Sequence, residues 1–269
     1  MKAQLHIQTA LRNSKTYLKN AFHTTPFKIA DVTEDKTQKP LRLMLMTSSP
    51  GILNGDDYNI EIDIAEDCTL ELQTQSYQRL FSMTNGASQT MEVRMQKNAS
   101  FHFLPHPTVP HKNAYFIAKN KIYLSTGCSL IWSDVFTCGR KLSGEAFAFS
   151  KYHSITKFFF NNKMVVKENL LLQPATTNAS AIGQLEGYTH QSSFLYINET
   201  VSATLLVQKL NELLTTENVC FGVSILPVNG VIVRMLGFKG EQLYNLHKKM
   251  AAFIIQLVTN PAKATAYAV

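Results

Sequence analysis

Three histidines lie close together in the segment FHFLPHPTVPH, at His102, His106 and His111. Imidazole is a preferred ligand of divalent transition metals, and on a regular strand His102 and His106 would project to the same side. Three prolines in the same segment break that regularity, so the alternative is a rigid connection with solvated histidines. We therefore keep His102 and His106 as weak candidates for metal ligands and expect no tight metal site.

Two carboxylates stand in loops framed by glycine. Asp56 lies in the segment SPGILNGDD, and Glu145 lies in GRKLSGEAF. Glycine allows the backbone to turn sharply or to approach a ligand closely. An isolated buried carboxylate is costly unless it pairs with or binds a cation, so these two mark a polar path if they point inward. The framing loop glycines are Gly51, Gly55, Gly139 and Gly144.

Sequence motifs of common enzyme classes are missing from the chain. It has no GxSxG elbow, no glycine-rich phosphate loop ending in Lys-Ser/Thr, no HExxH and no dinucleotide fingerprint. We therefore expect that the protein is not an enzyme and has no catalytic residues. The alternative is a metal-dependent enzyme that uses His102, His106 and the loop carboxylates.

The composition bounds the possible partners. The 269 residues are 45% hydrophobic and 17% charged, which is enough apolar material for a sizeable core. Net charge is +7, but the basic residues come singly, so we expect no nucleic-acid partner.

The N-terminal segment is too polar for a signal peptide, and no apolar run approaches the ~18 residues that span a bilayer. Four scattered cysteines disfavour a disulfide framework and a zinc site. We expect a cytoplasmic protein without a membrane partner, in which most cysteines are buried thiols.

From about residue 41 to residue 172 the sequence alternates between apolar and polar residues, as half-buried strands require. Three segments of this region also align as a repeat, 60–72, 91–103 and 120–132. Each contains a residue that tolerates a left-handed turn (Asp67, Asn98 or Gly127), followed by a small residue (Cys68, Ala99 or Cys128). Every unit is thus predicted to be two strands joined by a tight corner.

Such units would each expose an apolar face alone, and stacking them buries those faces in one core. We therefore predict a mainly β fold with a β-helix-like stack of strands or hairpins in residues 1–200. The alternative is an ordinary β-sandwich with similar turns.

Past residue 200 the period becomes helical. Apolar residues are spaced as one face of a helix at 206–214 and again at 243–257, and the second stripe ends before Asn260-Pro261. Between them, two apolar runs flank Asn229-Gly230, a strong hairpin signal. We predict that residues 201–269 form a helix, hairpin, helix element that packs on the β body and covers an open edge, as one structural unit with it.

Five segments in order resemble the UreD/UreH family of urease accessory proteins. SPGILNGDD resembles the family's Pro/Gly-Gly-x-x-x-Gly-Asp loop, and LELQTQSYQRLF resembles the strand and turn that follow it. LPHPTVPHKNAYF resembles the Pro-rich segment that ends in Asn-Ala-x-Phe, and IWSDVFTCGRKLSGEAFAF and LEGYTHQSSFLYIN continue the match. The resemblance covers residues 25–200 well, although Arg79 stands where many members carry lysine.

The resemblance implies a largely β fold with two helices and a scaffold role in nickel insertion into apo-urease. It implies three partners, a UreF-type accessory protein, a UreG-type GTPase and the urease apoprotein. It further implies an internal polar path for nickel, to which we assign Asp56, Asp134 and Glu145. Nickel would pass transiently, with no stably bound cofactor, because oxygen ligands and water along a path release the ion more readily than a closed cage of His or Cys.

Overall fold

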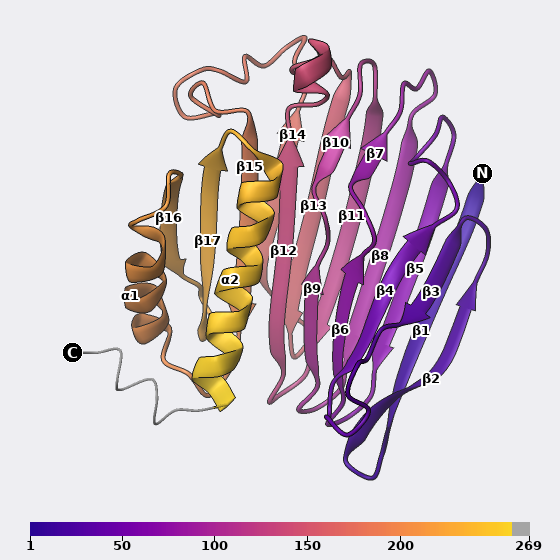
Figure 1. Cartoon of the computed structure of the whole chain (residues 1–269), viewed down its shortest axis with the longest axis vertical. Helices are drawn as coiled ribbons and strands as arrows, with labels where there is room; N and C mark the ends of the chain where they lie inside the picture. Colours follow the sequence, from indigo (N-terminus) through magenta and orange to yellow (C-terminus); the bar gives the residue numbers. More distant parts are fainter. Residues whose placement is uncertain (260–269) are drawn as a thin grey trace.

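The alternating segments of the sequence form two large β-sheets that face each other over one core (Figure 1). A computed structural model describes residues 1–259 of the chain. Sheet A contains, in spatial order, β14 (Lys163–Leu172), β13 (Lys151–Phe160), β11 (Tyr115–Leu124), β8 (Ala87–Met95), β5 (Asp57–Ile64), β1 (Lys2–Arg12) and β2 (Lys15–His23). Sheet B contains β16 (Cys220–Ile225), β17 (Gly230–Gly237), β15 (His190–Ile197), β12 (Ser129–Thr137), β9 (Ser100–Leu104), β6 (Thr69–Thr74), β4 (Leu41–Thr47) and β3 (Phe27–Asp31). Two short strands, β7 (Gln78–Leu80) and β10 (Thr108–Pro110), extend sheet B.

The predicted repeat unit is a strand of sheet A, a corner and a strand of sheet B. Successive units pair in parallel, β5 with β8 and β8 with β11 in sheet A, and β6 with β9 and β9 with β12 in sheet B. The corners gather at one end of the molecule, and the longer loops lie at the other (Figure 1). Long loops on one end of a stack are where function usually resides.

The corners adopt the left-handed conformation that was predicted. Asp67 and Asn98 each have φ of 57°, and Gly127 has φ of 75°. A side chain at Gly127 would collide with Asn98 Oδ1, so the third unit needs glycine where the first two carry Asp and Asn. The small residues that follow, Cys68 and Ala99 among them, are fully buried.

The prediction of a mainly β fold with two helices is confirmed. The body consists of two facing sheets. Its central units stack in parallel, and antiparallel strands are added by β2, β14, β15, β16 and β17. Strands β1, β2 and β3 lie before residue 41, within the predicted β body of residues 1–200 but ahead of the alternating pattern that located its strands. Ala3, Leu5 and Ile7 alternate into the core from β1, which pairs in parallel with β5.

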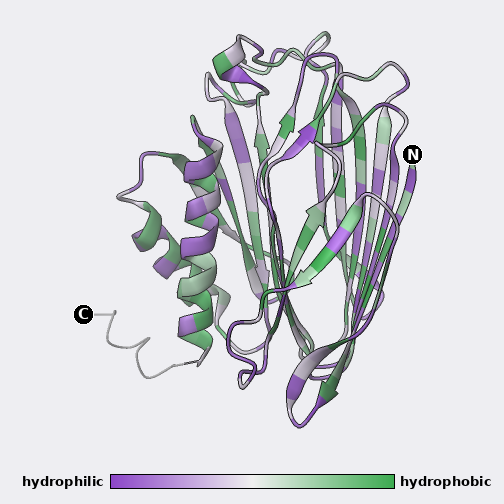
Figure 2. Ribbon diagram, turned by 45° about the vertical axis from the view of Figure 1, so that its right-hand side comes forward, coloured by the Kyte–Doolittle hydropathy of each residue, from purple (hydrophilic) through white to green (hydrophobic). Residues whose placement is uncertain are grey.

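The C-terminal region has the predicted order of helix, two strands and helix. Helix α1 (Ala203–Leu214) and helix α2 (Gly240–Thr259) lie along the outer face of sheet B (Figure 2). Their buried stripes form a second core with the outer faces of β12, β15 and β17. Strand β17 pairs with β15, so the hairpin continues sheet B. The predicted helix stop at Asn260-Pro261 lies outside the described residues, and the division at residue 200 stays a prediction.

Cysteine usage agrees with the sequence reading. Cys68, Cys128 and Cys138 are buried thiols, Cys220 is exposed, and none of the four forms a disulfide. Neither helix within residues 1–259 is long and apolar enough to cross a membrane.

Candidate functional site

A cavity of about 310 Å³, partly open to solvent, lies between the two sheets. Its wall mixes apolar side chains of the core with neutral polar ones, including Gln78, Gln89 and Asn120. Gln78 Nε2 donates to Gln89 Oε1 at 3.1 Å, and Thr108 Oγ1 donates to Gln78 Oε1 at 3.2 Å. Among the described residues that line this cavity, Asp134 is the one carboxylate. Arg79 and His106 also line it, so the cavity presents mainly neutral hydrogen-bonding groups together with one guanidinium, one imidazole and one acid.

A second cleft, of about 380 Å³, lies between β14 of sheet A and strands β15 and β17 of sheet B. Trp132, Asp134 and Ser154 line both the cavity and this cleft. Asp134 thus stands where the two spaces meet.

A polar layer crosses the strands at the level of Asp134. In sheet B, Asp134 pairs with Ser193 and Ser193 pairs with Arg234, so that three polar side chains form one row on β12, β15 and β17. In sheet A, a facing row is formed by Asn120, Thr156 and Glu168 on β11, β13 and β14. Neighbouring strands lie about 4.8 Å apart, so each row of three spans roughly 10 Å. The layer runs from the cavity to the edge of the stack.

Hydrogen bonds and an ion pair tie the layer together at its outer end. Ser193 Oγ donates to Glu168 Oε2 at 3.2 Å, and the guanidinium of Arg234 pairs with the other oxygen of Glu168. At the inner end, Asn120 Nδ2 donates to Thr156 Oγ1 at 2.9 Å. The outer pair bridges the two sheets, because Glu168 belongs to sheet A and Arg234 to sheet B.

Asp134 is the electrostatically perturbed member of the layer. Burial, followed by the nearby charge of Glu168, raises the pKa of Asp134 to about 6, and the N–H of Val135 partly offsets the rise. The neighbouring Tyr152 also has a pKa well above its ordinary value, because it is buried and close to the charge of Asp134. A carboxylate whose charge is disfavoured in this way gains from a cation that neutralises it.

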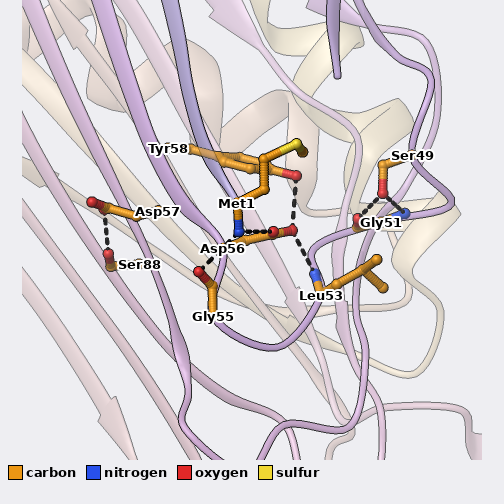
Figure 3. Close-up of polar contacts among 9 residues, drawn as sticks. All are labelled: Met1, Ser49, Gly51, Leu53, Gly55, Asp56, Asp57, Tyr58 and Ser88. Atoms are coloured by element: carbon orange, nitrogen blue, oxygen red, sulfur yellow. Dashed lines mark hydrogen bonds and ion pairs between the residues drawn. The ribbon is translucent and has the colours of Figure 1, made fainter. Parts of the chain in front are cut away.

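Asp56 lies at the loop end of the molecule and is held by donors of its own (Figure 3). Oδ2 accepts the N–H of Leu53 at 2.8 Å and the hydroxyl of Tyr58 at 3.0 Å, and Oδ1 accepts the ammonium of Met1 at 3.0 Å. The side chain is only 4% exposed. Tyr58 lines the cavity and Asp56 does not. Burial and the bond to Asp56 raise the pKa of Tyr58.

Glu145 lies in the loop after β12, at the same end of the molecule as Asp56. Its carboxylate accepts Arg140 Nε at 2.9 Å and the backbone N–H of Lys112 at 3.1 Å. These contacts, the bond to Arg140 first, lower the pKa of Glu145 to about 2. Glu145 lines neither the cavity nor the cleft. Its contacts join two loops at the surface.

Each of the four loop glycines is required, either because another backbone atom lies too close for a side chain or because its φ is positive. A side chain at Gly51 would collide with the carbonyl oxygen of Arg79, and one at Gly139 would lie 2.7 Å from the carbonyl oxygens of Pro110 and Glu145. Gly55 and Gly144 have φ of 75° and 77°. All four therefore shape the loops that carry Asp56 and Glu145.

Of the two candidate histidines, His102 faces the outer side of sheet B, while His106 contacts helix α2 and also lines the cavity. His102 lies 3.2 Å from Ser100 Oγ through Nε2 and 3.7 Å from Glu71 through Nδ1. The ring of His106 stacks on Tyr244 of α2 at 4.4 Å, and its Nδ1 lies 3.0 Å from Thr74 Oγ1. No group of three or more His, Cys, Asp or Glu side chains suited to a metal ion occurs within residues 1–259.

Of the three acids assigned from the sequence, the cavity wall contains Asp134, while Asp56 and Glu145 are each paired elsewhere. Sequence reasoning missed Glu168 and Arg234. The signal was present for Glu168, because it shares the inward face of β14 with Val166 and Leu170. A charged residue on the apolar face of an alternating strand marks a buried polar layer.

The fold and this site together define a β scaffold in which a cavity and a cleft between the sheets share one carboxylate, Asp134. The UreD urease accessory protein family model matches residues 1–266. A urease accessory protein UreD of Flavobacterium johnsoniae is 47% identical over 249 residues, which are 92% of this chain and 90% of the relative. The UreD of Acetivibrio thermocellus is 33% identical over 92% of this chain and 95% of its own length, and that of Haemophilus influenzae strain 86-028NP is 32% identical over 94% and 99%. The chain belongs to the UreD family of urease accessory proteins.

Proposed function

We propose that the chain is a non-catalytic scaffold for urease maturation that offers Ni(II) a polar path toward apo-urease. It would join the urease apoprotein to a UreF-type accessory protein and, through that protein, to a UreG-type GTPase. Family membership supports the role in urease maturation. The partners and the nickel path are the proposal, and we place the complex in the cytoplasm.

The observation that carries the path is the position of Asp134 between the cavity and the cleft. Nickel is the cargo here and must leave again, so a route lined mainly by neutral amides and hydroxyls, with a single acid, suits it better than a closed ligand set. Arg79 and His106, which also line the cavity, would add one fixed positive charge and one imidazole to this route. The glutamines and Asn120 would hydrogen-bond to the water shell of the ion, and Asp134 would supply the one anionic oxygen.

The path proposal assigns different roles to the three acids. Asp134 meets the ion, whereas Asp56 and Glu145 keep the loop end of the molecule in shape through the donors that they bind. Loss of Asp56 or Glu145 would thus reduce maturation through folding or partner binding. Loss of Asp134 would reduce nickel delivery from a folded protein.

Urease activity in cells tests the proposed role. The urease subunits and the other accessory proteins are expressed with nickel, with or without this chain, and complexes are isolated through a tag on the chain. We expect that omission abolishes urease activity and that the tagged chain retains the UreF-type and UreG-type proteins and apo-urease. Full urease activity without the chain would overturn the proposal.

The alternative of a metal-dependent enzyme has no observation in its favour. His102 and His106 contact Glu71, Ser100, Thr74 and Tyr244, and Asp56 and Glu145 lie apart from them with partners of their own. Membership of an accessory protein family also weighs against it.

A further inference from the structure

The outer end of the polar layer, where the two sheets part, combines a carboxylate, a guanidinium and an open space. We propose that Arg234 is a resident counter-cation that gates this end of the path. Its guanidinium neutralises Glu168 until Ni(II) arrives, and Glu168 then turns to the metal as a second oxygen ligand beside Asp134. The inference rests on the proposed function, because it assigns a control element to the same path.

The register of the strands brings the participants together. Ser193 is the direct neighbour of both Asp134 and Arg234 in sheet B, and its hydroxyl donates to Glu168 from the opposite sheet at 3.2 Å. Glu168 therefore lies over the middle of the row, with Arg234 on one side of it and Asp134 on the other. All four residues line the same cleft.

The charges favour exchange of one cation for another. With Arg234 in place, two carboxylates that line one cleft, Glu168 and Asp134, share the single positive charge of Arg234. A divalent ion between the two carboxylates neutralises both, which a single guanidinium does not do. Lys167 also lines the cleft, so free cations in solution meet a partly positive opening.

Arg234 has room to leave. Its side chain is 58% exposed, and the pair is therefore weak enough to exchange. The residue paired with Arg234 on the edge strand β16 is Gly222, and a side-chain atom added there would meet nothing within 4 Å. The guanidinium can thus move across β16 into solvent without displacing another side chain.

Nickel binding to the isolated full chain tests the gate. Affinity for Ni(II) alone is measured at pH 7.5 by competition with a chromophoric chelator. We expect that Arg234→Ala binds Ni(II) about tenfold more tightly than the wild type, because Glu168 no longer has a competing cation. Adding Glu168→Gln to Arg234→Ala should return the affinity to the wild-type value or below. Arg234→Lys, which keeps the charge, should stay within about threefold of the wild type.

Arg94→Ala is the matched control, because Arg94 pairs with Glu92 and Asp63 on the outer face of sheet A. It should leave nickel affinity unchanged, and thermal unfolding checks that each variant is folded. Arg234→Gln replaces Arg234→Ala if the alanine variant does not fold. Wild-type affinity in a folded Arg234→Ala or Arg234→Gln variant, or an equal gain in Arg94→Ala, would overturn the gate.

The same variants in the cellular urease assay separate the two proposals. If omission of the chain abolishes urease activity while Arg234→Ala has wild-type nickel affinity, the gate is wrong and the maturation role stands. If omission has no effect on urease activity, the maturation role itself is wrong, whatever the affinities.

Discussion

At the scale of single residues, Asp134 carries a charge that works against stability. It is ionised at neutral pH although burial and Glu168 raise its pKa to about 6. Asp56 avoids this conflict, because its carboxylate accepts from three donors. A group that is costly for folding and faces a cavity is a candidate for function.

Replacing Asp134 with Asn should therefore stabilise the protein at pH 7. The folded pKa of about 6 lies above the ordinary value of 3.8, so the folded state binds the proton more tightly and stability falls as pH rises between the two values. At about 1.4 kcal/mol per pH unit, the charge costs up to roughly 3 kcal/mol, and we expect a gain of roughly 1–3 kcal/mol. Urea denaturation at pH 7 and at pH 4 measures it. A stabilisation that is as large at pH 4 as at pH 7 would contradict this explanation.

Asp56→Ala should have the opposite effect on stability. It removes a buried carboxylate that accepts from Leu53 and Tyr58, and hydrogen bonds to charged groups contribute about 1.5–3 kcal/mol each. We expect a loss of roughly 2–4 kcal/mol in the free energy of unfolding, measured by urea denaturation. Asp57→Ala is the control, because Asp57 is exposed and binds only Ser88 at 2.6 Å. Equal losses in the two variants would show that the donors of Asp56 do not matter.

At the scale of elements, the corners and helices were the parts that the sequence predicted best. The corner signal is local, because Asp, Asn and Gly tolerate positive φ, and it is repeated three times. The individual N-terminal strands were not located, although Ala3, Leu5 and Ile7 alternate with polar residues. Strands β1 and β2 lie before residue 41 and outside the aligned repeat. Sheet membership is decided by pairing between distant segments, which no local pattern records.

Helix α2 contains a buried histidine that should make its packing depend on pH. His247 is fully buried at 5.5 Å from Phe194, and neither ring nitrogen has a hydrogen-bond partner among the described residues. Burial lowers the pKa of His247 to about 3 from 6.5. The unfolded state therefore binds the proton more tightly, and stability is lost as pH falls below 6.5.

His247→Leu removes this contribution. We expect that the wild type loses roughly 2 kcal/mol more than His247→Leu between pH 7 and pH 5, at about 1.4 kcal/mol per pH unit below the ordinary value. Thermal or urea unfolding at the two pH values compares the proteins. Parallel pH profiles would show that His247 is not neutral in the folded state or is already paired.

At the scale of the whole molecule, sheet B extends beyond the edge of sheet A, and the outer end of the proposed path lies at that edge. Sheet A stops at β14, while sheet B continues through β17 and β16, with both helices on its outer face. Glu168 and Arg234 face each other where sheet A stops. A layer built from six strands that are distant in sequence could not be predicted from local patterns, although Asp134 was identified through the family resemblance.

The nickel content of purified urease is the most direct measure of whether Asp134 delivers nickel from a folded scaffold. Urease is purified from cells that express all accessory proteins with wild-type chain, Asp134→Asn, or the control Asp63→Asn on the outer face of β5. We expect that Asp134→Asn lowers the nickel content and specific activity of urease at least fivefold while the variant still co-purifies with its partners, and that Asp63→Asn leaves both near wild type. Fully nickel-loaded urease from cells with Asp134→Asn would contradict it.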